Sequence, residues 1–232
     1  MTCRVILAMP YPRSVKTARQ PLHERAKPLL RGRLHQAGFF LSIPAGLVLV
    51  VVAPGPKARV GAIVYWMSLL LQFGASATYH VGTWEERMHA RLRTLDHSTI
   101  FVLIAGTYTP FCLVVLHGWT SVAVLAVVWG GAAVGVATKL YRVDLHVLSG
   151  FMYVGLGWVA VIILPAMVRE LSTTAFVLMV TGGVLYTVGA LTLATHWPDP
   201  FPKVFGYHEV WHTFVVAAGV CHFALIMLLV RP

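Results

Sequence analysis

The sequence predicts an all-α, polytopic membrane protein: a seven-transmembrane-helix bundle with a cytoplasmic N-terminus. Of its 232 residues, 58% are hydrophobic and only 11% are charged, whereas an average soluble domain carries about 25% charged residues. Folding removes only about 70–75% of the unfolded surface from water in a chain of this size, so a soluble domain could not hide this many apolar side chains. The composition therefore excludes an ordinary soluble protein, a disordered chain and a disulfide-rich secreted module.

Seven apolar runs are long enough to cross a membrane, since a helix needs about 20 apolar residues to span a hydrocarbon core of roughly 30 Å. Open sheet edges cannot face lipid, and the runs are too long for the strands of a membrane barrel, so each run is predicted as a helix. The expected spans are 34–53, 60–80, 95–116, 121–138, 146–168, 174–195 and 208–230.

Turn-forming and charged residues separate these spans one after another. Three prolines (Pro44, Pro110 and Pro165) fall inside spans, where neighbouring groups are expected to satisfy the freed backbone groups. The separating segments are, in chain order, Pro54-Gly55-Pro56, the loop with Arg87, Arg91 and Arg93, His117-Gly118, Lys139, Arg169-Glu170, His196-Trp197-Pro198 and Arg231-Pro232.

The charges outside the spans orient the bundle. Fourteen Lys and Arg residues fall in the N-terminal segment and in the loops on its side of the membrane, against four on the other side. The positive-inside rule therefore predicts a multi-pass plasma-membrane protein with a cytoplasmic N-terminus and an external C-terminus. Residues 1–33 are expected to form a basic cytoplasmic tail, and residues 34–232 the transmembrane domain. Nucleic acid is not an expected partner, because the positive charges are not interleaved with aromatic side chains.

Polar and ionisable side chains gather at the cytoplasmic ends of four predicted spans. An ionisable group at the centre of a membrane helix costs about 2.5–3.5 kcal/mol in insertion measurements, so its position is a functional signal. The external ends of the spans carry only scattered polar residues. The clustered residues are His35 on the first span, Ser76 and His80 on the second, Asp96 on the third, and His208, Glu209 and His212 on the seventh.

The spacing of these residues predicts a metal site. His208 and His212 are four residues apart, so their imidazoles share one helix face and can bind the same Zn²⁺ at about 2.0–2.1 Å. His80 is the predicted third ligand. Asp96 is expected to accept a proton from the water on the metal or to hold that water, and Ser76 to orient the water or a substrate carbonyl. Imidazole ligands without thiolates favour zinc over other divalent ions.

The segment His208-Glu209-Val210-Trp211-His212 also matches the H-E-x-x-H pattern, in which two histidines bind zinc and the glutamate is a base. Intramembrane site-2-type metalloproteases carry this pattern on a membrane helix. Such a protease also needs a later Leu-Asp-Gly-type carboxylate ligand, whereas Leu95-Asp96-His97 precedes the pair and lacks the glycine. Proteolysis is therefore the weaker hypothesis. Glu209 is expected to face the loop or a basic neighbour, or to act on the site as a base outside the ligand set.

Over residues 31–229 the chain resembles the hemolysin III family, which belongs with the progestin and adiponectin receptors and more distantly with the alkaline ceramidases. The specific part of the resemblance is the ordered set S-x-x-x-H, D and H-x-x-x-H. The matching segments are Arg31-Gly32-x-x-His35, Ser76-Ala-Thr-Tyr-His80, Leu95-Asp96-His97, Ala105-Gly-Thr-Tyr-Thr-Pro110-Phe111 and Phe205-Gly-Tyr-His208-x-x-x-His212.

This resemblance implies a seven-helix bundle in which three histidines, here His80, His208 and His212, bind Zn²⁺. It implies that Asp96 holds the water on the metal and that Ser76 lies beside that water. The histidine at position 35 matches a family position, and it is expected to support the ligands without binding the metal itself.

Two functions stay open at this point. The first is a zinc-dependent hydrolase of lipid amides or esters, with membrane lipids, a lipid amide or a free fatty acid as partners, as the ceramidase relatives imply. The second is a non-enzymatic, receptor-like membrane sensor in lipid homeostasis, in which structural zinc ties the second and seventh spans together. A pore-forming haemolysin is less favoured, because no amphipathic pore-lining helix is visible in the sequence.

Overall fold

The computed structural model describes residues 27–141 and 146–231, and the regular elements within these ranges are all α-helices. The tail predicted over residues 1–33 therefore lies mostly outside the described residues. The helices are α1 (Arg33–Val52), α2 (Gly55–Val81), α3 (Glu86–Val114), α4 (Gly118–Leu140), α5 (His146–Gly157), α6 (Val159–Ile162), α7 (Leu164–Glu170), α8 (Thr173–Thr195) and α9 (Tyr207–Leu229).

Six of the described helices are long and apolar enough to cross a membrane: α1, α2, α3, α4, α8 and α9. The segments Leu148–Ile162 and Leu164–Glu170 make a seventh span if they are counted together across the bend of 56° between them. The described part of the chain is thus an all-helical, polytopic membrane protein, as the composition predicts.

The fifth predicted span, 146–168, is not one continuous helix. It is divided into α5, α6 and α7, and Pro165 stands in the first turn of α7. A proline inside a helix removes one backbone hydrogen bond, and its ring clashes with the carbonyl group four residues earlier. Pro165 therefore accounts for the break between α6 and α7.

Helix α3 begins well before the apolar run from which its span is predicted. It starts at Glu86, and its 29 residues extend about 43 Å, compared with a hydrocarbon core of roughly 30 Å. The additional turns carry arginines, which a search for apolar runs excludes. Asp96 consequently lies inside a helix and not at its first residue.

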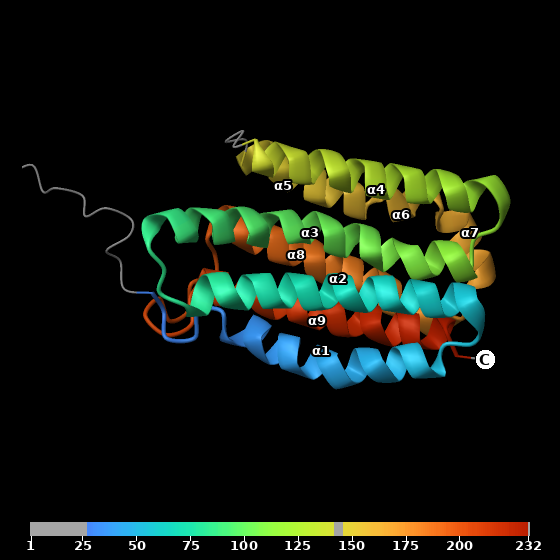
Figure 1. Cartoon of the computed structure of the whole chain (residues 1–232), viewed down its shortest axis with the longest axis horizontal. Coiled ribbons are helices and arrows are strands. Elements are labelled where there is room, and N and C mark those ends of the chain that lie inside the picture. The colour runs from blue at the N-terminus through green and yellow to red at the C-terminus, as the bar shows by residue number, and fades with distance from the viewer. Residues whose placement is uncertain (1–26, 142–145, 232) are drawn as a thin grey trace, which may run out of the picture.

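The helices pack around two apolar cores that share α3 (Figure 1). One core joins α1, α2 and α9, and it includes Tyr65 and Phe73 of α2. The other core lies between α3, α4 and the segment α5–α7, and it includes Val128 of α4. Leu103 belongs to the first core and Phe101 to the second. Helix α3 therefore packs against both halves of the bundle.

Four helix termini meet at one end of the bundle. Figure 1 shows that α1 begins, α2 ends, and α3 and α9 begin at this same end. Most of the polar residues singled out in the sequence lie close to these termini, and Asp96 lies almost three turns into α3. The fold thus brings together the ends of helices that are far apart in the chain, which is the condition for a common site.

Candidate metal centre

Three histidines from two helices converge at this end of the bundle. His80 lies in the last turn of α2, and His208 and His212 lie in the first two turns of α9. One ring nitrogen from each histidine can be chosen so that all three nitrogens lie within 4.8 Å of one another. His80 Nε2 and His208 Nε2 are 3.2 Å apart. The convergence expected from the sequence is therefore present in the structure.

Local sequence explains why the two α9 histidines point the same way. The helix begins directly after Gly206, whose backbone N–H donates to the Glu209 carboxylate at 2.8 Å, so the first turn is closed by its own third residue. Positions 208 and 212 then stand one turn apart on one face. His80 reaches the same place because α2 continues to Val81, two turns beyond Phe73 of the apolar core.

The donor set fits a zinc ion. Two nitrogens bound tetrahedrally at 2.0–2.1 Å are about 3.3 Å apart, close to the 3.2 Å between His80 and His208. Both ring nitrogens of His212 are buried without a hydrogen-bond partner, whereas buried polar atoms in folded proteins are nearly always paired. A bound cation would satisfy one of these nitrogens.

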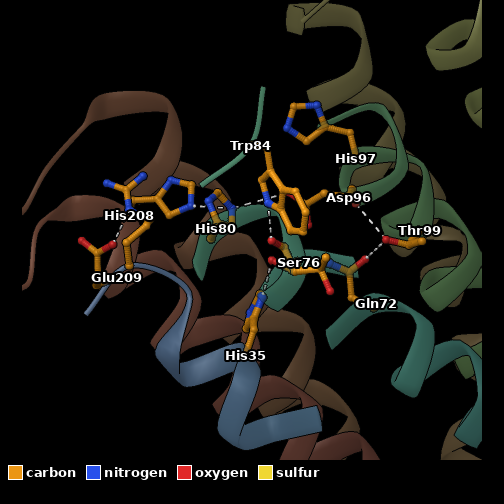
Figure 2. Close-up of polar contacts among 12 residues, drawn as sticks. His35, Gln72, Ser76, His80, Trp84, Asp96, His97, Thr99, His208 and Glu209 are labelled. Carbon is orange, nitrogen blue, oxygen red and sulfur yellow. Dashed lines mark hydrogen bonds and ion pairs between the residues drawn. The ribbon is translucent and has the colours of Figure 1, made fainter. Parts of the chain in front are cut away.

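Asp96 is the carboxylate beside the histidines. Its Oδ2 lies 3.6 Å from His80 Nε2, and its side chain is almost completely buried. Figure 2 shows Asp96 on the side of His80 opposite His208. The carboxylate therefore flanks the cluster of histidines.

Ser76 contacts His35, the histidine that the sequence analysis expects to support the metal ligands without binding the metal. The Ser76 Oγ and the His35 Nδ1 are 2.7 Å apart in a buried hydrogen bond (Figure 2). The His35 ring in turn stacks on the His212 ring, with 3.8 Å between centroids and 6° between planes. His35 thus links Ser76 of α2 to a ligand of α9, which agrees with a role in holding the ligands.

Glu209 does not point into the cluster. Its Oε2 accepts the Gly206 N–H, and its Oε1 lies 2.6 Å from Arg31 Nε. Figure 2 places the Glu209 side chain beyond His208, away from His80 and Asp96. The expectation that Glu209 faces a basic neighbour agrees with the structure. The arrangement lacks the exposed glutamate base that H-E-x-x-H proteolysis requires.

Three contributors to the site were not identified from the sequence. Gln72 and Thr99 extend the polar cluster, because the Thr99 hydroxyl lies 2.8 Å from both the Gln72 Oε1 and the Asp96 carbonyl oxygen. Gln72 stands four residues before Ser76, so its spacing was a usable signal. Arg31 opens the family-like segment Arg31-Gly32-x-x-His35, but the sequence did not identify it as the basic neighbour of Glu209, because this contact depends on the path of the segment before α1.

Two grooves open on the described surface. One of about 340 Å³ lies between α1 and α2 and is lined by Gln36, Phe39, Gly74, Ala77 and Trp84 among others. The second, of about 590 Å³, lies along α3 and α4. Neither of these two grooves is lined by a histidine of the cluster.

Comparisons with known proteins give one consistent match. The model of the family described as "Haemolysin-III related" matches residues 23–223. The chain is 34% identical over 197 residues to the protein named "Hemolysin-3 homolog" of Bacillus subtilis (strain 168), which covers 83% of this chain and 89% of that protein. It is 32% identical over 203 residues to "Hemolysin-3" of Bacillus cereus, with 85% and 89% covered.

Proposed function

This chain belongs to the hemolysin III family, and from that premise we propose that it is a zinc-dependent membrane hydrolase of lipid amides or esters. The observation that carries the proposal is the buried convergence of His80, His208 and His212 with a carboxylate at its edge. Three protein ligands leave one position of a tetrahedral ion for a reacting molecule, which is the arrangement of catalytic zinc sites.

His80, His208 and His212 would hold the zinc ion, and when bound it would supply Lewis acidity at this place. The Asp96 carboxylate is the acceptor placed to take a proton at the edge of the cluster. The His35–Ser76 hydrogen bond holds the Ser76 hydroxyl oxygen in place. Ser76 can then donate to a substrate carbonyl oxygen when His35 Nδ1 carries the proton of their bond.

The proposed substrate follows from the surroundings of the site. The cluster lies at the end of an apolar helix bundle, so an acyl chain can remain in the lipid while its polar linkage reaches the histidines. We place the site at the cytoplasmic leaflet of the plasma membrane in a seven-span topology. The charge excess on the N-terminal side of the predicted spans supports this placement.

A second function has an observation in its favour. Two members of the cluster are enclosed, since His212 and Asp96 are exposed by only 1% and 3%, whereas His208 is only partly buried. Such enclosure suits a structural zinc that ties α2 to α9 in a non-enzymatic, receptor-like sensor of lipids.

The test uses the full-length protein purified in detergent and a panel of ceramides and acyl esters, with products measured by mass spectrometry. The wild type is expected to hold one zinc per chain and to release fatty acid. His208→Ala is expected to lose the zinc, and Asp96→Ala to keep most of it while losing hydrolysis. His117→Ala removes an exposed histidine and is the matched control, expected to keep both properties.

The outcomes separate the two functions. Zinc bound in the wild type with no product from any lipid of the panel, and no change in membrane lipids between wild type and Asp96→Ala, would favour the sensor. Equal zinc loss in His208→Ala and Asp96→Ala would make Asp96 a ligand and remove its proposed role as base.

A further inference from the structure

The residues before α1 cross the end of the bundle that carries the histidines, and residues 27–32 are called the strap below. The Lys27 ammonium donates to the Gly82 carbonyl oxygen at 3.0 Å, directly after the last residue of α2. Two strap amides donate to carbonyl oxygens of the loop before α9, both at 3.1 Å; the pairs are Leu29 with Lys203 and Leu30 with Val204. The strap thus connects the ends of the two helices that supply the candidate ligands.

Gly32 places the backbone of the strap against His80, one of the candidate ligands. Its φ of +77° lies in the left-handed region, which glycine adopts without the steric cost of a side chain. A Cβ at position 32 would lie 2.6 Å from the Cβ of His80. The backbone of the strap is therefore in contact with the α2 ligand.

Arg31, the preceding residue, reaches the α9 ligands through Glu209. The Arg31 Nε and the Glu209 Oε1 are 2.6 Å apart, and the Glu209 side chain is only 1% exposed. The other carboxylate oxygen accepts the Gly206 N–H, whereas Oε1 has the ion pair with Arg31 and no hydrogen bond. Glu209 follows His208 directly and precedes His212 by three residues, so the carboxylate belongs to the turn that sets the spacing of both histidines.

Loss of the guanidinium would leave this carboxylate buried without its cationic partner. A buried charge whose partner is removed is strongly destabilised, and Glu209 would have to rotate toward water. The first turn of α9, which it closes, would then shift, and His208 would shift with it.

We propose that Arg31 is a positioning residue of the metal centre, which acts through Glu209 to hold the α9 histidines at the spacing that retains the ion. The inference rests on the proposed zinc site. It assigns the glutamate of the H-E-x-x-H pattern a structural task, and it makes the Arg31–Glu209 pair part of the site although neither residue is a ligand.

The test measures how fast zinc leaves the full-length, zinc-loaded protein when a chromogenic chelator is added in excess. Residues that orient metal ligands typically change affinity 10–100-fold when mutated, so Arg31→Ala and Glu209→Gln are expected to release zinc at least 10-fold faster than wild type. Arg31→Lys, which keeps the positive charge, is expected to recover part of the difference. The double variant Arg31→Ala/Glu209→Gln is expected to release zinc no faster than the faster single variant, because both changes break one interaction.

Arg33→Ala is the matched control. Arg33 is exposed, two residues away, and donates to the Gln36 side-chain oxygen at 2.8 Å, so its loss removes the same charge without touching α9. Release rates within twofold of wild type for both Arg31→Ala and Glu209→Gln would overturn the proposal. If Arg31→Ala does not yield folded protein, Arg31→Lys and Glu209→Gln carry the same comparison.

A second readout separates positioning from general loss of stability. With Co²⁺ in place of zinc, the visible d–d absorption reports the geometry of the ligands, and it is expected to change in Arg31→Ala and not in Arg33→Ala. Unchanged spectra in both variants, with faster release explained by a lower unfolding temperature, would reject positioning. Failure of the proposed zinc site itself is distinct: the wild type would then bind neither zinc nor cobalt.

Discussion

Three buried polar side chains of α2 stand at intervals of four residues, Gln72, Ser76 and His80, and so share one face of the helix. This spacing is visible in the sequence, as is the spacing of His208 and His212. The sequence therefore predicts which side chains share a helix face. Which of these faces lie against one another follows only from the fold, which brings the helix ends together. The contact of Arg31 with Glu209 could not be predicted, because it depends on how the strap folds over the bundle.

Close contacts between helices lead to a prediction at the same scale. A Cβ at Gly61 of α2 would lie 2.6 Å from the Cα of Pro110 in α3, and backbone atoms cannot rotate away as a side chain can. Gly61→Ala is therefore expected to destabilise the protein by about 1–3 kcal/mol, the usual cost of overpacking. The midpoint of thermal unfolding in detergent measures the effect.

Gly130 of α4 is the control for this substitution, because a Cβ there would meet nothing within 4 Å. Gly130→Ala is expected to leave the unfolding midpoint unchanged or slightly raised, since alanine favours helix more than glycine does. Equal destabilisation by the two substitutions would contradict the argument from the α2–α3 contact.

At the scale of elements, apolar runs predict six helices well and a seventh incompletely. The start of α3 is missed because its first turns carry charged residues, and hydropathy detects only the part of a helix that faces lipid. Proline is an ambiguous signal. Pro44 and Pro110 lie inside the continuous helices α1 and α3, whereas Pro165 lies at the break before α7. The packing around each proline, which the sequence does not give, decides between these outcomes.

The start of α8 gives a prediction that concerns one element. Ser172 precedes this helix, and its hydroxyl accepts the Ala175 N–H at 3.3 Å. Ser172→Ala leaves that amide without its cap and is expected to lower stability by about 0.5–1 kcal/mol. Ser172→Asp is expected to restore it, because aspartate caps as well as serine does. Thermal unfolding of the three proteins side by side checks the order, and an alanine variant as stable as wild type would refute it.

At the scale of the whole molecule, the distribution of charge predicts how the bundle lies in the membrane. The end with the histidine cluster is expected to face the cytoplasm. Arg91 lies in the charged turns of α3 at that end, and His117 lies between α3 and α4 at the opposite end. Single cysteines at these two positions can report the orientation, provided that Cys3, Cys112 and Cys221 are first replaced by alanine.

Labelling of intact bacterial cells with a membrane-impermeant maleimide is expected to modify His117→Cys and not Arg91→Cys. Permeabilised cells are expected to label both. Labelling of Arg91→Cys in intact cells, with His117→Cys protected, would reverse the orientation and move the site to the outer leaflet.

The sharing of α3 between two cores has a mechanical consequence. All three candidate ligands lie on α2 and α9, which belong to one core. Asp96 lies on α3, the helix that the two cores share. A tilt of α3 would change the distance between the Asp96 carboxylate and the His80 imidazole. The distances among the three histidines of α2 and α9 would stay the same. If the histidines bind the proposed ion, one half of the molecule would hold it, and the position of α3 would set the distance between the ion and the Asp96 carboxylate.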